Sequence, residues 1–367
     1  MDLPAGLGDL KDYAVNLAAL VIALPTLLLF ISCANFFSLR RPLKESSLFP
    51  GSVAVLLPVR NEEANIPALV ESLRKQMGIS DLTFLFIDDG STDNTFELIN
   101  ESIKDDARFS IRIGETLPSG WLGKPFALHQ GLIATTSEIV VVIDADVRLH
   151  ADALVSAINL MKSRKLAFVS AYPRQIAISW SERLIQPLLQ WSWMSTVPLA
   201  IAERSSNPAF AVANGQFFIA ERSALEAAGG FASVRSEIID DIALARVFLR
   251  QGFKGTVIDG SDIATCRMYA SWPELREGYS KSLRVAFGSH IGSIIAVVFL
   301  IAVGIAPLTI GVFGYFILIS SRLVSALATR ARIFDVLLHP LSIALLIYLL
   351  GRSWLMRGRT QWKGRLV

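Results

Sequence analysis

Two aspartates follow a strongly apolar run near the middle of the chain. Asp144 and Asp146, separated by one residue, come directly after Ile139–Ile143, which reads IVVVI. Mg²⁺ and Mn²⁺ are hard cations that bind carboxylate oxygens and often share them with the phosphates of a substrate. A D-x-D on its own is more often a solvated turn, but its position after an apolar strand favours a metal and phosphate site.

A second acidic pair ends another apolar run. Asp88 and Asp89 follow Leu82–Ile87 and precede Gly90, which lets the chain turn sharply. These carboxylates can accept hydrogen bonds from a ribose or a base. The alternative is a turn that caps the next helix. Together, the two acidic pairs indicate a nucleotide site.

The elements that would position these aspartates are short strands alternating with helices. Runs rich in Val, Leu and Ile predict buried strands at Val53–Pro58, Leu82–Ile87 and Ile139–Ile143. Between the first two runs, apolar residues recur at helical spacing at Ile66, Leu69, Val70 and Leu73. We therefore expect an α/β domain with a parallel, helix-covered sheet, whose ligands bind beyond the carboxyl ends of the strands.

The composition indicates a membrane protein. Of the 367 residues, 52% are apolar and only 18% are charged, and the mean hydropathy is +0.48. A soluble domain usually carries about a quarter charged residues, so the excess apolar sequence belongs in a lipid bilayer. The 35 Lys and Arg against 32 Asp and Glu leave a net charge of +3. Such a small surplus argues against a nucleic acid partner.

Stretches without charge place the membrane spans at the two ends of the chain. Tyr13–Leu39 has no charged residue and exceeds the roughly 20 residues that a spanning helix needs. Residues 1–45 are therefore expected to form an amino-terminal transmembrane segment, with its helix at about 13–39. Residues 287–367 are expected to form a carboxy-terminal region of two or three spans and a basic tail. The total stays open at three or four spans.

The charges next to the first span predict its orientation. Arg40, Arg41 and Lys44 follow this span, whereas acidic residues precede it. The positive-inside rule then places the amino terminus outside and residues 46–286 in the cytoplasm. We therefore expect a multi-pass protein of the cell membrane (inner or plasma membrane) whose α/β domain is cytoplasmic.

Two segments within residues 46–286 are suited to the membrane surface. Residues 180–201 contain three tryptophans and two prolines, a composition too broken for a span and too apolar for water. An amphipathic segment in the headgroup layer has this character, and a core helix of the soluble domain is the alternative. Residues 269–285 are expected to form a second interfacial helix. Trp272, Lys281 and Arg284 within it are candidates for binding a lipid or gating its access.

The acidic motifs, taken in order, resemble the signatures of glycosyltransferase family 2. The motifs are Pro58-Val59-Arg60-Asn61-Glu62, Asp88-Asp89-Gly90-Ser91-Thr92-Asp93, Asp144-Ala145-Asp146 and Asp240-Asp241. The resemblance extends over about Val53–Gly252, and the ordered set is more specific than any one motif. It implies a GT-A domain, which is α/β and Rossmann-like with a mostly parallel sheet, and an inverting reaction with a nucleotide-sugar donor.

The resemblance also implies which residues bind the donor. The nucleotide pocket would be lined by Pro58, Arg60, Glu62 and Asp89. Asp144 would contact the ribose or the diphosphate. Asp146 would bind the Mg²⁺ or Mn²⁺ ion that bridges the donor phosphates.

Asp241 is implied as the general base, because it occupies the second position of the acidic pair that precedes a helix. The family usually has Glu at the first position, where this chain has Asp240. At a helix start, the dipole and the free amides are expected to keep the Asp241 carboxylate ionised, with Asp240 pointing elsewhere. Lys124 follows the turn-forming sequence GWLG and can pair with a phosphate, although a surface lysine is as often solvated.

Further motifs resemble the membrane-bound branch that includes hopanoid-associated and carotenoid glycosyltransferases. They are Gly120–Lys124, Asn214–Phe217, Arg267–Tyr269 and Trp362–Arg365. Asn214, Gly215 and Gln216 are, with Asp240, candidates for binding or gating the acceptor. Cellulose and hyaluronan synthases carry Gln-x-x-Arg-Trp, and both the Gln and the Trp are missing from the corresponding stretch, Ser280–Val285.

The leading hypothesis is a membrane-embedded, metal-dependent hexosyltransferase. It would move a sugar from a UDP- or GDP-sugar to the hydroxyl of a polyisoprenoid, carotenoid or glycerolipid-like acceptor. One alternative is a polyprenyl-phosphate glycosyl synthase, and a less favoured one is a processive polysaccharide synthase. A catalytically silent scaffold or transport component is disfavoured because Asp89, Asp144, Asp146 and Asp241 are all present. An assay without acceptor would reveal a nucleotide-sugar hydrolase.

Overall fold

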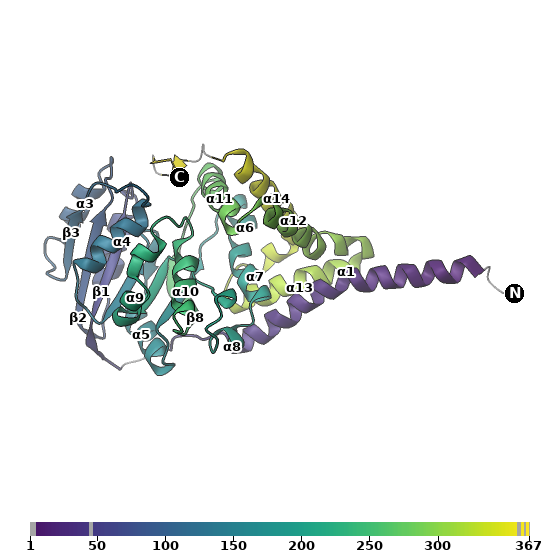
Figure 1. The fold of residues 1–367 in the computed structure, drawn as a ribbon, viewed down its shortest axis with the longest axis horizontal. Helices are drawn as coiled ribbons and strands as arrows, with labels where there is room; N and C mark the ends of the chain where they lie inside the picture. The colour runs from purple at the N-terminus through teal and green to yellow at the C-terminus, as the bar shows by residue number, and fades with distance from the viewer. Residues whose placement is uncertain (1–4, 44–46, 358–360, 363–364, 367) are drawn as a thin grey trace. The chain divides into compact units, whose positions relative to one another are not determined.

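The computed structural model describes residues 5–43, 47–357, 361–362 and 365–366. The chain divides into two compact units, a helical unit and a sheet unit (Figure 1). The helical unit comprises Met1–Phe37, Ala177–Pro198 and Ser271–Arg357. The sheet unit comprises Ser38–Ile176, Leu199–Ala270 and Gly358–Val367. The domain boundaries expected at residues 45 and 286 stay predictions.

The sheet unit is built around a mixed sheet with the strand order β3-β2-β1-β4-β7-β6-β8-β5. The strands are β1 (Phe49–Val59), β2 (Ile79–Asp88), β3 (Phe109–Ile113), β4 (Ile139–Ile143), β5 (Val147–Leu149), β6 (Phe168–Gln175), β7 (Phe217–Glu221) and β8 (Gly255–Cys266). Strands β3, β2, β1 and β4 run parallel, and so do β6 and β8. Strand β7 is antiparallel to β4 and β6, and β5 is antiparallel to β8. The three apolar runs of the sequence are β1, β2 and β4.

Helices cover both faces of this sheet, because successive strand residues point to opposite sides. Val55 and Val141 pack into a core with α2 (Ile66–Arg74), α3 (Thr95–Ile103) and α5 (Ala153–Ser163). Leu56 and Val142 pack into a second core on the other face, with α4 (Gly123–Ile133), α9 (Arg222–Ala227) and α10 (Asp240–Arg250) (Figure 1). The continuous apolar runs thus reflect strands that are buried on both sides.

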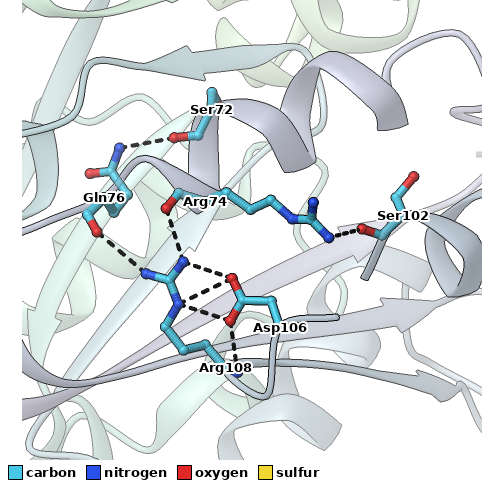
Figure 2. A network of polar contacts seen from close by, with 6 residues as sticks. All are labelled: Ser72, Arg74, Gln76, Ser102, Asp106 and Arg108. Carbon is cyan, nitrogen blue, oxygen red and sulfur yellow. Dashed lines mark hydrogen bonds and ion pairs between the residues drawn. The ribbon is translucent and has the colours of Figure 1, made fainter. Parts of the chain in front are cut away.

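A polar network fixes the ends of α2 and α3 beside β3 (Figure 2). Arg108 donates hydrogen bonds to the carbonyl oxygens of Arg74 at 2.9 Å and Gln76 at 3.3 Å. Its Nη2 atom also lies 2.7 Å from Asp106 Oδ2, and Arg74 in turn donates to the carbonyl oxygen of Ser102. Because the last carbonyls of a helix lack intrahelical partners, Arg108 caps α2. This network therefore joins the end of α2 to α3 and to the residue that precedes β3.

The helical unit contains the apolar ends of the chain. Its helices are α1 (Ala5–Ser38), α6 (Trp180–Ile185), α7 (Pro187–Thr196), α11 (Trp272–Ala286), α12 (His290–Gly304), α13 (Val312–Ala328) and α14 (His339–Leu355). Within the described residues, three segments are long and apolar enough to cross a membrane, namely Asn16–Ser38, His290–Ile310 and Ile333–Leu355. Val312–Ala328 is apolar but shorter. Three or four spans therefore remain the alternatives.

The tryptophan-rich segment 180–201 lies mostly within the helical unit. Trp191 Nε1 donates to Ser321 Oγ of α13 at 2.9 Å, and Arg183 forms an ion pair with the buried Asp335. Trp191 and Trp193 are buried, whereas Trp180 is 58% exposed. The segment therefore packs against the apolar helices, and its location at a membrane surface stays a prediction.

Candidate active site

The sheet topology brings the predicted donor-binding residues to one edge. Strands β2, β1 and β4 are parallel neighbours, so their carboxyl ends meet at the same edge of the sheet. Pro58 is the penultimate residue of β1, Asp89 follows β2, and Asp144 follows β4. Asp146 immediately precedes β5. All four are in the sheet unit.

Arg60 joins the loops that follow β1 and β2. Its Nη1 atom donates to the carbonyl oxygens of Asp89 and Gly90, the latter at 2.9 Å. The backbone N–H of Asp89 donates to Val59 O at 2.9 Å. Asp88, by contrast, accepts hydrogen bonds from both the backbone N–H and the hydroxyl of Ser91. Asp88 therefore stabilises the turn to Ser91 and does not cap α3, whose N-cap is Asn94. The role of Asp89 in binding a nucleotide stays a prediction.

Hydrogen bonds hold Glu62 in the loop between β1 and α2. Its backbone N–H donates to Thr95 Oγ1 at 2.7 Å, and its Oε2 accepts from Asn65 Nδ2 at 2.8 Å. Asn65 Oδ1 accepts from Arg148 Nη2 at 3.0 Å. The Glu62 carboxylate is close enough to Asp146 to raise the pKa of that side chain.

The environment of Asp146 suits a divalent cation. Burial, followed by the charge of Asp144, raises the pKa of Asp146 to about 6, although a hydrogen bond with Cys266 opposes the shift. Asp146 Oδ1 is buried and accepts no hydrogen bond from the described residues. A cation bound there would remove the repulsion between the two aspartates.

Within the described ranges, no group of three His, Cys, Asp or Glu side chains is arranged to hold a metal ion. A cation at Asp146 would therefore take its remaining ligands from substrate phosphate and water, as Mg²⁺ usually does. The residues present fit a metal that binds together with a nucleotide diphosphate.

Lys124 lies at the start of α4 and contacts Asp144. The distance from Lys124 Nζ to Asp144 Oδ1 is 2.6 Å, and both side chains are about 30% exposed. Burial lowers the pKa of Lys124, but the charges of Asp144, Asp240 and Asp241 outweigh this effect and raise it above its usual range. Lys124 is therefore a charged, half-buried site residue rather than a solvated surface lysine.

Asp241 lies in the first turn of α10, as the sequence predicts. Its Oδ2 accepts from the Gly215 backbone N–H at 2.6 Å, and its Oδ1 accepts from the Ile242 N–H at 2.7 Å. Burial and then the charge of Asp240 raise the pKa of Asp241 to about 6, while Lys124 and these two backbone N–H groups lower it. The backbone N–H groups expected at a helix start are present, but burial raises the pKa of Asp241 more than these groups lower it.

Asp240 is also electrostatically part of this cluster. It raises the pKa of Lys124 more strongly than Asp241 does, and it raises the pKa of Asp241 itself. Its side chain, expected to point away from that of Asp241, therefore still acts on the same lysine.

The turn 214–216 connects Asp144, on the predicted donor side of the site, to Asp241. Gly215 N–H bonds to Asp241, and Gln216 O accepts from the Asp144 N–H at 3.2 Å. The Gln216 side chain is buried, and its Oε1 accepts from Asn214 Nδ2 at 3.0 Å and from Gln175 Nε2 at 2.8 Å. The predicted candidates Asn214, Gly215 and Gln216 thus lie between Asp144 and Asp241.

Sequence reasoning missed the residues of β6 that support this turn. Ser170 and Tyr172 both contact Asn214, and Gln175 contacts Gln216. The strand reads FVSAYPRQ, in which a buried serine or glutamine is not distinguishable from a solvated one. Only the long-range pairing of β6 with β7 assigns these residues to the site.

The remaining acceptor candidates lie in the other unit. Trp272, Lys281 and Arg284 are on α11 of the helical unit. The Trp272 ring lies 5.4 Å from that of Trp180, and the Arg284 guanidinium lies 5.9 Å from the Trp354 ring. Their role in binding or gating an acceptor stays a prediction.

Comparison with known proteins identifies the class. The mannosyltransferase PcManGT from Pyrobaculum calidifontis, solved in complex with GDP-Man and Mn²⁺, matches with a TM-score of 0.56 at 18% identity, covering 95% of this chain and 98% of that chain. The fold is that of the GT-A glycosyltransferases. Residues 54–229 match the family model Glycosyl transferase family 2 and form a domain of that family.

Two curated relatives are similar to this chain over most of its length. They are the 4,4'-diaponeurosporenoate glycosyltransferases of Staphylococcus haemolyticus (strain JCSC1435) and Staphylococcus aureus (strain bovine RF122 / ET3-1), each 26% identical to it. The matches cover 69% and 73% of this chain and 66% and 70% of the relatives, respectively. The predicted family, GT-A fold class and resemblance to carotenoid glycosyltransferases are confirmed.

Proposed function

We propose that this protein is a membrane-bound, inverting glycosyltransferase that moves a sugar from a nucleotide-diphosphate sugar to a lipid acceptor. The observation that carries the proposal is the arrangement of Asp144, Lys124, Gly215 and Asp241. In this arrangement, Lys124 contacts Asp144, which we place beside the phosphates and the metal, and Lys124 also lies next to Gly215. Gly215 in turn bonds to the carboxylate of Asp241 at the start of α10. The family domain and the carotenoid glycosyltransferase relatives support the reaction class.

The donor binds across the loops that follow β1, β2 and β4. Pro58, Arg60, Glu62 and Asp89 line the nucleotide pocket, and the bonds from Arg60 to the β2 loop hold the two sides of that pocket together. Asp144 contacts the ribose or the diphosphate. The donor is a UDP- or GDP-sugar, and GDP-Man in the Pyrobaculum complex supports a nucleotide-diphosphate sugar.

Asp146 would hold Mg²⁺ or Mn²⁺ next to the diphosphate, and the Mn²⁺ in the Pyrobaculum complex supports the use of a divalent cation. When bound, the cation supplies positive charge to the departing diphosphate. Lys124 provides a second positive charge that the protein itself holds in place beside Asp144. Its ammonium group can pair with a phosphate oxygen when the donor occupies the site.

Asp241 removes the proton from the acceptor hydroxyl. The acceptor oxygen forms a bond to C1 of the sugar, while the bond from C1 to the diphosphate oxygen breaks and its electron pair leaves with the diphosphate. A single displacement of this kind inverts the configuration at C1. Burial and Asp240 keep the pKa of Asp241 near neutrality, which suits a carboxylate that must accept a proton in the transition state.

The acceptor is a lipid-like molecule with a hydroxyl group. The acceptor in the name of the two staphylococcal relatives, 4,4'-diaponeurosporenoate, supports a carotenoid or similar polyisoprenoid. Its -oate ending denotes a carboxylate, so the relatives support the carotenoid skeleton, and the hydroxyl group is part of our proposal alone. The three apolar segments support access from a bilayer, and the basic residues after the first span support a cytoplasmic sheet unit in the cell membrane. A polyprenyl phosphate is the alternative acceptor, and being already ionised it would need no base.

Comparison of cellular lipids tests the proposal. Cells that express the wild-type chain, its Asp241→Asn variant or neither are extracted with organic solvent, and the extracts are compared by mass spectrometry. We expect a lipid heavier by one hexose unit only with the wild-type chain. Indistinguishable lipid profiles in the three strains would overturn the proposal.

A further inference from the structure

A buried serine in β6 supports the turn that contacts Asp241. Ser170 is fully buried within the sheet. Its hydroxyl accepts a hydrogen bond from the Asn214 backbone N–H at 2.7 Å and donates to the Asn214 carbonyl oxygen at 3.0 Å. One side chain therefore holds both the N–H and the carbonyl group of one turn residue.

The serine lies where the strand ladder ends. Strands β6 and β7 pair through Ser170 and Phe218, and β7 begins at Phe217. Before that residue the chain leaves the sheet, so its backbone groups need other partners. The Ser170 hydroxyl supplies them for Asn214, and Tyr172, two residues along on the same face of β6, bonds to the Asn214 side chain.

The turn is braced internally as well. Asn214 Oδ1 accepts from the Gln216 N–H at 2.9 Å, which leaves the Gly215 N–H between them to donate to Asp241 Oδ2 at 2.6 Å. The contacts form a continuous series from Ser170 through Asn214 and Gly215 to the carboxylate.

We propose that Ser170 is a positioning residue for Asp241, because its hydroxyl holds the turn 214–216 in the conformation that directs the Gly215 N–H at the Asp241 carboxylate. Ser170 itself contacts no reacting group in this proposal. The inference rests on the proposed function of Asp241 as the base and assigns a supporting residue outside the family motifs.

The expected consequence of losing the hydroxyl is a less stabilised carboxylate. A hydrogen bond to the charged form of a carboxylate favours that form, so loss of the Gly215 bond raises the pKa of Asp241. The charged or titratable groups known to act on this carboxylate are Asp240 on α10, Lys124 on α4 and Tyr172 on β6. None of them is changed by a substitution at Ser170.

The test is the pH profile of kcat for the full chain in detergent. The assay uses extracted membrane lipid and whichever of UDP-glucose, UDP-galactose and GDP-Man gives lipid-linked sugar. We expect the acidic limb of Ser170→Ala to move upward by about 0.5 to 1 pH unit, with the loss of rate largest at low pH and nearly absent at high pH. Nucleotide affinity is expected to stay within about twofold of wild type, because Ser170 contacts no predicted donor residue.

Matched variants separate positioning from general damage. Ser170→Thr keeps the hydroxyl and should restore the profile. Asn214→Ala loosens the same turn from its other side and should shift it in the same direction. The control is Ser156→Ala, in α5, since Ser156 is buried but its hydroxyl has no hydrogen-bond partner among the described residues. This control should leave the profile unchanged.

The outcomes distinguish the two claims. A Ser170→Ala profile that superimposes on that of wild type, or that falls by the same factor at every pH, overturns the positioning role. An active Asp241→Asn variant together with a wild-type profile that has no acidic limb overturns the base itself. In that case the proposed function of Asp241 fails, not only this inference.

Discussion

Lys124 Nζ lies 2.6 Å from Asp144 Oδ1, and the same atom is 3.1 Å from the position that a Cβ atom on Gly215 would occupy. The lysine therefore fills the space between the donor-side aspartate and the turn that holds Asp241. This close approach depends on a residue without a side chain at position 215.

Gly215→Ala is expected to lower kcat by about tenfold or more, since small displacements of positioned groups are costly in catalysis. The new methyl group would be in ordinary contact with Asp241 Cβ at 3.4 Å, so Lys124 Nζ, at 3.1 Å, is the atom that must shift, and it would shift relative to Asp144. The matched control is Gly351→Ala in α14, where no atom lies within 4 Å of the added Cβ. Equal activity of the two variants in a sugar-transfer assay would contradict this account of the site.

Asp146→Ala is expected to abolish Mn²⁺-dependent binding of UDP or GDP while the protein stays folded. The reason is that Asp146 Oδ1 is a buried acceptor without a partner in the described part of the chain, and a cation is the partner that we propose. Titration calorimetry of the purified protein, with and without Mn²⁺, measures the effect. Unchanged Mn²⁺-dependent affinity in this variant would refute the metal assignment.

The buried aspartates also predict how stability depends on pH. The pKa values of Asp146 and Asp241 are both raised to about 6, against about 3.9 in an unfolded chain. Between these values the folded state holds more protons than the unfolded state, so metal-free stability should fall as the pH rises from about 4 to 6.

Thermal unfolding of the metal-free protein at pH 4.5 and pH 7.5 checks this prediction. The decrease in Tm at the higher pH should shrink in a double Asp146→Asn, Asp241→Asn variant. It should persist in Asp81→Asn, which changes an exposed aspartate on β2. An identical pH dependence of Tm in the double variant and in the wild type would show that these two groups are not shifted.

Part of the site could be predicted from local sequence. The strands that precede Asp89 and Asp144 are continuous apolar runs, and parallel neighbours deliver their carboxyl ends to one edge. The helical spacing of Ile66, Leu69, Val70 and Leu73 also predicted a helix, and the structure has α2 there with all four residues buried. The local sequence is sufficient to predict these elements because their buried residues recur at the spacing of a strand or a helix.

The rest depended on pairings between distant residues. Gly215 meets Asp241 across 26 positions, and Asn214 meets Ser170 across 44. These contacts arise because β7 inserts antiparallel between β4 and β6, and neither strand order nor direction is encoded in a local run of residues. The raised pKa of Asp241 was missed for the same reason, since burial is a property of the assembled site.

Topology gives a separate prediction. Arg40 and Arg41 follow the first apolar helix, so the sheet unit should face the cytoplasm. A reporter inserted at Gly90, an exposed position, should be active only when it is of the kind that works in the cytoplasm. Activity of a periplasmic or extracellular reporter at this site would reverse the predicted orientation.

The central claim is sugar transfer to a lipid hydroxyl with Asp241 as the base, and the direct measurement is transfer of labelled sugar from UDP- or GDP-sugars to extractable lipid by the purified chain. Asp241→Asn should lower kcat by at least about 10²-fold with little change in donor affinity, and Asp240→Asn should lower it less. We predict lipid-linked label with the wild-type protein and nearly none with Asp241→Asn. Release of free sugar without any lipid product, or near-normal transfer to a hydroxyl by Asp241→Asn, would contradict the account.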